Sequence, residues 1–245
     1  MSAAPLFARY AYPPNVLGYC GPPDPKALVD AGSAGAKAED LVSVARRFSG
    51  AWPYLELIAA SNGIADPLDT RVVAAYWVGS KLLEGIPAAS LLHAIGKHPE
   101  SGLGAASQLQ AAAMAGGVAH HSFHVLAVYP WLALLRSGKQ EPAMTVLDRC
   151  RIRWGRVEEV EGANVIVRSR PLGFDGRNLV LLDERVEQAC CSVDGVGFVE
   201  DLSPGDLVSL HWDWVCDRLD PDALAYLQHF TARNLHAVNT TTPAG

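Results

Sequence analysis

The chain has 245 residues, of which 49% are hydrophobic and 19% charged, and its formal net charge is −6. This composition is typical of a folded globular protein that is long enough for one large domain or two small ones. The acidic balance argues against nucleic acid as the main partner, because phosphate neutralisation needs a basic face.

The first 35 residues combine many prolines and glycines with several aromatic side chains. Because proline interrupts helices and inner strands, we expect no long helix here, but an ordered irregular strap packed on the helices that follow. The start has neither the charged region nor the continuous apolar core of a signal peptide. The longest apolar run, 125–135, is too short for a bilayer, so we expect a cytoplasmic protein without membrane contact.

Helical periodicity follows the strap, because apolar residues recur three and four positions apart. The helices are expected at 37–49, 51–62, 67–84, 87–97, 103–115 and 118–137. Asp66 followed by Pro67 is typical of a helix start, and Pro130 predicts a break in the last helix. Residues 1–148 are therefore predicted to form an all-α domain with a proline-rich N-terminal strap.

From Cys150 the hydrophobic period changes to two, which is typical of strands. Five short apolar segments separated by glycine-containing turns predict a small OB-like β-barrel. A final amphipathic helix begins at Asp220, a predicted N-cap, with Pro221 in its first turn. We therefore predict an α+β fold, in which the all-α domain is followed by this barrel and the C-terminal helix over residues 149–245.

The helical half contains the segment AHHSFHV, with His120 and His124 four positions apart. On a helix this spacing places two imidazoles on one face, as binding of one metal ion requires. His121 would then point about 100° away, as a neighbour of the pair. No glutamate stands between the two histidines as in a zinc protease. Packing of both rings in an apolar core is the alternative.

The chain has five cysteines, an odd number without CxxC spacing, so neither a disulfide framework nor a zinc ribbon is expected. Cys20 lies in the strap between two glycines, beside Tyr19, in the segment LGYCGPP. Loops of this kind often line sites on a rigid scaffold. The alternative is a covering strap whose aromatic residues fill the helical core.

The barrel half begins with CRIRWGRVEEVEGANVIV, in which Gly155 follows Cys150 by five positions, and later contains PGDLVSLH, which ends at His211. It closes with DRLDPDAL, which leads into the last helix. In this order and spacing, residues 150–236 resemble the HypC/HupF family of [NiFe]-hydrogenase assembly chaperones. The opening segment FARYAYPPNVLGYCGP resembles an uncharacterised bacterial family, from which we infer no activity.

The resemblance to the chaperones implies a carrier role. The family cysteine and histidine help hold an iron fragment that bears cyanide and carbon monoxide, and they correspond here to Cys150 and His211. The fragment passes between a HypD-like iron-loading partner and the hydrogenase large subunit. This chain departs from the family in four ways. The cysteine, which is the mature N-terminus in the family, is preceded by 149 residues, Arg151 replaces a small or aliphatic residue, Trp154 replaces a proline, and the barrel segment between the motifs is longer.

The residues themselves are consistent with metal chemistry. A thiolate and an imidazole together suit iron, zinc or copper. Arg151 and Arg153 would lower the pKa of the Cys150 thiol and suit an anionic fragment, and Asp213 could orient the imidazole of His211. The alternative is a buried structural cysteine whose arginines pair with glutamates at 158, 159 and 161.

Two functions follow from these patterns. The first is a hydrogenase maturation factor, a carrier and not a turnover catalyst, that holds iron through Cys150 and His211. Its helical half would dock a partner or supply further ligands from His120, His124 and Cys20. The second is an iron- or haem-dependent metalloenzyme that uses the helical histidines, with the barrel as docking module. An interaction protein without metal is the third alternative.

Overall fold

The computed structural model describes residues 3–32, 38–96, 106–136, 138, 140–193 and 196–241. The helices are α1 (Ala3–Val16), α2 (Pro25–Gly32), α3 (Ala38–Ala45), α4 (Trp52–Ser61), α5 (Thr70–Trp77), η1 (Lys81–Leu83), α6 (Ala88–Gly96), α7 (Ala106–Met114), α8 (His121–Phe123), η3 (His124–Val128), α9 (Trp131–Arg136), α10 (Gln140–Cys150) and α11 (Pro221–Thr240). The strands are β1 (Arg153–Glu161), β2 (Asn164–Ser169), β3 (Leu172–Phe174), β4 (Leu179–Leu181), β5 (Arg185–Cys190), β6 (Ser192–Val193), β7 (Val196–Gly197), β8 (Leu207–His211) and β9 (Trp214–Arg218). The α+β class predicted from the sequence is confirmed.

Five strands pair in the order β1-β2-β5-β9-β8, and β8 returns to β1, so the pairings form a closed barrel. The junction between β5 and β9 is a single parallel residue pair, Cys190 with Trp214, whereas the other neighbours are antiparallel. The hairpins β3-β4 and β6-β7 lie outside this ring. The segment GDLVSLHWDWV, whose alternating pattern predicts a single last strand, instead forms most of the hairpin β8-β9, which turns at Trp212 and Asp213.

The N-terminal segment differs from the expected irregular strap. Residues Ala3–Val16 form the helix α1, with Pro13 and Pro14 inside its last turns. Each proline lacks the N–H that would bond to the carbonyl four residues earlier, so both remove a bond within the helix, but they do not end the helix before Val16. Only the following segment, from Leu17 to α2, is irregular. The prediction of an irregular segment was therefore wrong for α1.

The helix boundaries follow local chemistry where side chains can cap them. Asp220 accepts a hydrogen bond from the N–H of Ala223 at 2.8 Å, which confirms it as the N-cap of α11. The helix expected to start at Asp66 begins later, because Asp69 caps α5. The break expected at Pro130 is present, with η3 before it and α9 after it.

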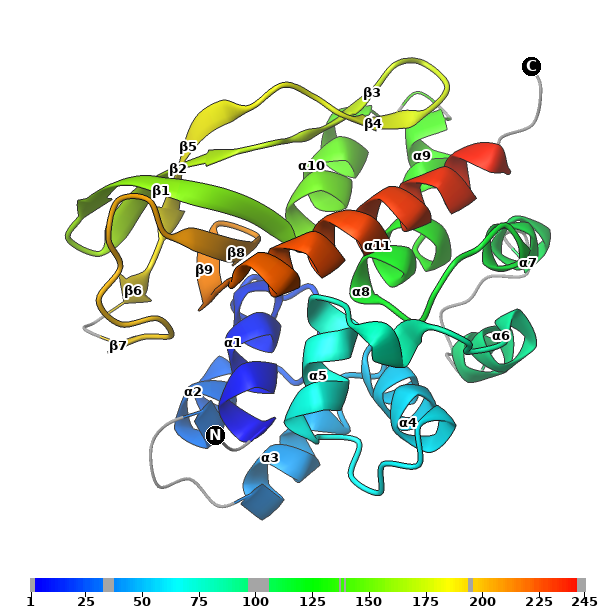
Figure 1. Ribbon diagram of the computed structural model, residues 1–245, viewed down its shortest axis with the longest axis horizontal. Coiled ribbons are helices and arrows are strands. Elements are labelled where there is room, and N and C mark those ends of the chain that lie inside the picture. The colour runs from blue at the N-terminus through cyan, green and yellow to red at the C-terminus, as the bar shows by residue number, and fades with distance from the viewer. Residues whose placement is uncertain are drawn as a thin grey trace.

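The helical half and the barrel share one hydrophobic cluster. It contains helical residues such as Phe7 and Leu147 together with Ile152, Trp212 and Cys216 from the barrel half. A second, smaller cluster of mostly valine side chains fills the barrel interior. Figure 1 shows α11 crossing the molecule between the barrel strands and the N-terminal helices. The boundary at residues 148 and 149 stays a prediction, and α10 runs through it.

None of the helices in the described part of the chain combines the length and apolar character that a membrane span requires.

The contact that fixes α11 on the helical half is between Phe230 and Gly79. Phe230 is fully buried, and Gly79 has a φ of +107°, a conformation that favours glycine. A Cβ added at Gly79 would lie against Cδ2 of the Phe230 ring and 2.9 Å from Cε2. The absence of a side chain here therefore permits the close approach of α11.

We expect Gly79→Ala to lower the free energy of unfolding by about 3 kcal/mol, from backbone strain and overpacking together. Gly85→Ala is the matched control, because Gly85 also has a positive φ, +79°, but nothing lies within 4 Å of the added Cβ. Its expected cost is about 1 kcal/mol. Urea unfolding measures the free energy of unfolding of both variants. Equal losses would show that the close contact with Phe230 adds nothing to the cost of the substitution.

Candidate metal centre

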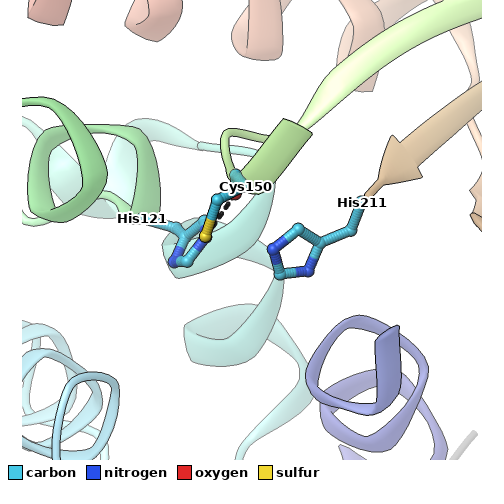
Figure 2. A group of neighbouring side chains, drawn as sticks. All are labelled: His121, Cys150 and His211. Carbon is cyan, nitrogen blue, oxygen red and sulfur yellow. Dashed lines mark hydrogen bonds between the residues drawn. The ribbon is translucent and has the colours of Figure 1, made fainter. Parts of the chain in front are cut away.

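Three buried side chains from distant parts of the sequence meet beside α1. Cys150 is the last residue of α10, His211 the last of β8 and His121 the first of α8. One ligand atom from each lies within 4.8 Å of those of the other two. Figure 2 shows the His121 ring and the Cys150 thiol side by side, with the His211 imidazole facing them. Within the described ranges, no other group of three potential ligands lies this close together.

The orientation of His211 is set by a backbone carbonyl of α1. Its Nδ1 lies 2.6 Å from the carbonyl oxygen of Tyr10, so Nδ1 carries the proton and donates. In an unbroken helix the N–H of residue 14 would bond to this oxygen, but Pro14 has no N–H. The carbonyl is therefore available to His211. Nε2 then bears the lone pair, is buried and has no hydrogen-bond partner.

His121 has hydrogen-bond partners for either tautomer. Its Nε2 lies 2.8 Å from the carbonyl oxygen and 4.0 Å from Sγ of Cys150, and its Nδ1 lies 3.2 Å from the hydroxyl of Tyr76. With the proton on Nε2, the ring donates to the Cys150 carbonyl. With the proton on Nδ1, it donates to Tyr76, whose hydroxyl lies 3.3 Å from the Gly50 carbonyl. The second tautomer leaves Nε2 free to bind a cation.

Burial determines the protonation of all three side chains. It lowers the pKa of His211 to about 4 and the pKa of His121 well below its usual value, so both rings are neutral near pH 7 and can act as ligands. Burial raises the pKa of the Cys150 thiol. The prediction that arginines lower this pKa was wrong, because both arginines are neutralised by carboxylates. A bound cation would shift the thiol to thiolate.

The two arginines after Cys150 are structural. Arg151 and Arg153 are 0% and 1% exposed. Arg151 lies 3.0 Å from Oδ1 of Asp148, whereas Arg153 pairs with Glu187 and donates to the carbonyl of Trp212 at 2.6 Å. Their partners are thus not the glutamates at 158, 159 and 161. Charge pairing compensates their burial and fixes the start of β1 beside the centre.

The histidine pair expected on one helical face is not formed. His120 precedes α8 as its N-cap, with extended backbone, and its Nδ1 accepts from the N–H of Ser122 at 3.1 Å. His124 instead lies 3.0 Å from the hydroxyl of Tyr54 through its Nδ1. Because the helix begins after His120, the spacing of four residues does not place His120 and His124 on one helical face. His121, expected to point away, is the histidine at the centre.

The strap residues lie near the centre without joining it. Cys20 lines a cavity of about 340 Å³ together with His121, but it is outside the group of three ligands. Burial raises the pKa of its thiol to about 12. Tyr19 stacks on Trp212 with ring centroids 4.3 Å apart. Asp213 does not orient His211, because it lies in the β8-β9 turn and pairs with Arg149.

Sequence reasoning missed two contributors to the centre, the Tyr10 carbonyl and the Tyr76 hydroxyl. Both lie far from the ligands in sequence, and a backbone carbonyl has no residue-type signature. Pro14 carries the one local signal, since a proline inside a helix leaves the carbonyl four residues earlier without its usual donor.

The chain matches the model of a family of unknown function (DUF6390) over residues 2–244, and it belongs to that family. No curated protein and no solved structure matches it.

We expect Pro14→Ala to weaken metal binding, because the new N–H would compete with His211 for the Tyr10 carbonyl. Loss of such an outer hydrogen bond typically lowers metal affinity about tenfold or more. Pro13→Ala is the matched control, because it adds an N–H one residue earlier, directed at the Arg9 carbonyl. Competition with a zinc chelator measures both affinities. Equal affinities in the two variants would contradict the role of Pro14.

We expect Glu187→Gln to lower the free energy of unfolding by about 3 kcal/mol, because it removes the nearest carboxylate of the buried Arg153 and leaves only the exposed Asp213, 4.0 Å away. The control is Glu158→Gln, since Glu158 pairs with Arg168 at the surface, 2.6 Å apart. That change should cost less than about 1 kcal/mol. Guanidinium unfolding at neutral pH compares the free energies of unfolding of the two variants. Similar losses would mean that the buried pair contributes no more to stability than the surface pair.

Proposed function

We propose that this protein is a [NiFe]-hydrogenase maturation factor that holds iron, as a fragment bearing cyanide and carbon monoxide, between Cys150, His211 and His121. The observation that carries the proposal is the meeting of Cys150 and His211, which lie far apart in sequence and whose ligand atoms lie within 4.8 Å. They are the two residues that correspond to the fragment-holding cysteine and histidine of the HypC/HupF family, which the barrel half resembles.

The ligand set suits a transition metal. A thiolate and two neutral imidazoles are soft and borderline ligands that favour iron, zinc and copper over calcium or magnesium. Neighbouring ligands of one ion at ordinary metal–sulfur and metal–nitrogen distances lie roughly 3 to 3.5 Å apart, so a small contraction of the present arrangement would bring the three atoms to one ion. The unpartnered, buried Nε2 of His211 supports the fit, because buried polar atoms are otherwise hydrogen-bonded.

The N-terminal half has a defined part in this proposal. In the HypC/HupF family the cysteine is the mature N-terminus, whereas here α1 and α8 cover Cys150 and supply the Tyr10 carbonyl and His121. The helices thus replace an exposed site by an enclosed one with a third ligand. The partners would be a HypD-like iron-loading protein and the hydrogenase large subunit, and transfer would take place in the cytoplasm.

A metalloenzyme is the second candidate. It is favoured by the cavity of about 340 Å³ that touches His121, because metal ions with three protein ligands and access for a small molecule are typical of catalytic sites. In this version His121, Cys150 and His211 hold the metal, in place of the expected His120 and His124.

The test uses full-length protein purified without oxygen from its native host, with iron content and infrared absorption measured together. We expect about one iron per chain and bands in the cyanide and carbonyl stretching region for the wild type. Cys150→Ala should lose both, because it removes the thiolate. Cys216→Ala is the matched control, since Cys216 is also buried but lies outside the ligand group.

The other outcomes separate the candidates. Iron that depends on Cys150 without cyanide or carbonyl bands would favour the metalloenzyme. Iron and bands that persist in Cys150→Ala would exclude the proposed ligands. A wild-type protein that binds no metal, even after reconstitution, would contradict both functions.

A further inference from the structure

The cavity of about 340 Å³ beside His121 has an aromatic wall. Phe48, Tyr76 and Trp77 line it and are almost fully buried, and the exposed Tyr19 also contributes. Its volume lies at the lower end of the range of small-molecule sites, which are lined mainly by apolar and aromatic side chains. Aromatic side chains favour planar ligands, since rings stack or meet edge to face. The inner part of the cavity therefore suits one small aromatic ring.

The turn 47–50, between α3 and α4, forms the mouth of the cavity. Arg47 and Ser49 are exposed there and Gly50 is half-buried. The backbone N–H groups of Ser49 and Gly50 donate to no group within the described chain, although those of Phe48 and Ala51 on either side are bonded. Successive N–H groups of this kind are a common element of anion sites, and the Ser49 hydroxyl can add a further donor. The mouth therefore offers donors for an anionic group.

The charges around this turn also favour an anion. Arg47 is the only arginine or lysine among the described lining residues, and no aspartate or glutamate is among them. The turn lies directly before α4, whose N-terminus carries a partial positive charge. The N-cap of α4 is Ala51, which has no side chain to accept a hydrogen bond there. A carboxylate at the turn would thus meet a cation, a helix N-terminus and free N–H groups, with no like charge in the wall.

We propose that this cavity binds a small aromatic carboxylate, with the carboxylate at the turn 47–50 and the ring among the buried aromatic side chains. The site is separate from the metal ligands, because Cys150 and His211 do not line it and His121 forms only part of its wall. The inference requires no bound metal, so it goes beyond the proposed function. An inorganic anion at the mouth would leave the aromatic inner part empty, and one molecule with a charge and a ring fills both.

The test uses the full-length protein and three probes. Benzoate carries both the ring and the carboxylate, benzamide replaces the charge by a neutral group of similar shape, and acetate lacks the ring. A saturation-transfer NMR titration measures the dissociation constant of each. We expect benzoate to bind with a dissociation constant of about 1 mM or below. Benzamide and acetate should bind at least about fivefold more weakly, because one loses charge-assisted hydrogen bonds and the other loses apolar burial.

Arg47→Glu should weaken benzoate binding about tenfold, because it reverses the charge beside the carboxylate, and should change benzamide binding less than about twofold. Arg46→Glu is the matched control. It makes the same change in net charge at the neighbouring residue, but the Arg46 guanidinium lies over the Trp52 ring, 5.3 Å from its centroid, and does not line the cavity. Benzoate affinity of this variant should stay within about twofold of the wild type, because solvent screens the exposed charge.

Four results would overturn the inference while leaving the metal centre intact. Folded wild-type protein that binds no benzoate would mean that the cavity holds only water. Equal affinities for benzoate and benzamide would remove the role of charge, and equal affinities for benzoate and acetate would remove the role of the aromatic wall. Benzoate that binds iron-loaded protein but is lost when a chelator removes the iron would be a ligand of the metal. Absence of iron from a wild-type protein that binds benzoate would contradict the proposed function alone.

Discussion

The hydrogen bond from His211 to the Tyr10 carbonyl is the constraint on which the rest of the centre depends. It joins residues 201 positions apart in sequence, at 2.6 Å, and both residues are fully buried. The carbonyl is available because Pro14 cannot donate to it. One bond thus docks α1 on β8, fixes the His211 tautomer and directs the other ring nitrogen toward Cys150 and His121.

The centre exists only when the whole chain is folded. His121 comes from the helical half, His211 from the barrel, and Cys150 from the helix that joins them, so neither half holds the complete ligand set. The shared hydrophobic cluster holds these segments in place. Any metal that binds the three ligands therefore also stabilises the contact between the halves, since binding to the folded state alone adds to its free energy of unfolding.

Local patterns predicted those features of the fold that local chemistry decides. The change from helical to strand periodicity near Cys150, the break at Pro130 and the N-cap Asp220 all depend on neighbouring residues. The helix α1 was missed because its two prolines, although each removes a hydrogen bond within the helix, do not end it. The extent of the last strand was missed because Trp212 turns the chain with a φ of +53°, which a tryptophan rarely adopts.

The site was predictable only in part, because local sequence patterns do not show which distant residues meet. Cys150 and His211 came from the resemblance of the barrel half. The choice among the three neighbouring histidines depended on His120 acting as N-cap, which moves the helix start from the expected residue 118 to His121 and sends His121 to the centre. The partners of Arg151 and Arg153 could not be read from nearby glutamates, because Asp148 and Glu187 approach through folding of the α10 end and β5.

Enclosure of Cys150 changes what this thiol can do. An exposed thiolate would exchange ligands quickly and would oxidise easily. Here burial raises the pKa of the thiol, so without a cation it stays protonated and unreactive. Burial likewise keeps His121 and His211 neutral. The three side chains therefore become a strong ligand set only together with a cation. The cation supplies the positive charge that stabilises the thiolate, because every other buried charge at the site is already paired.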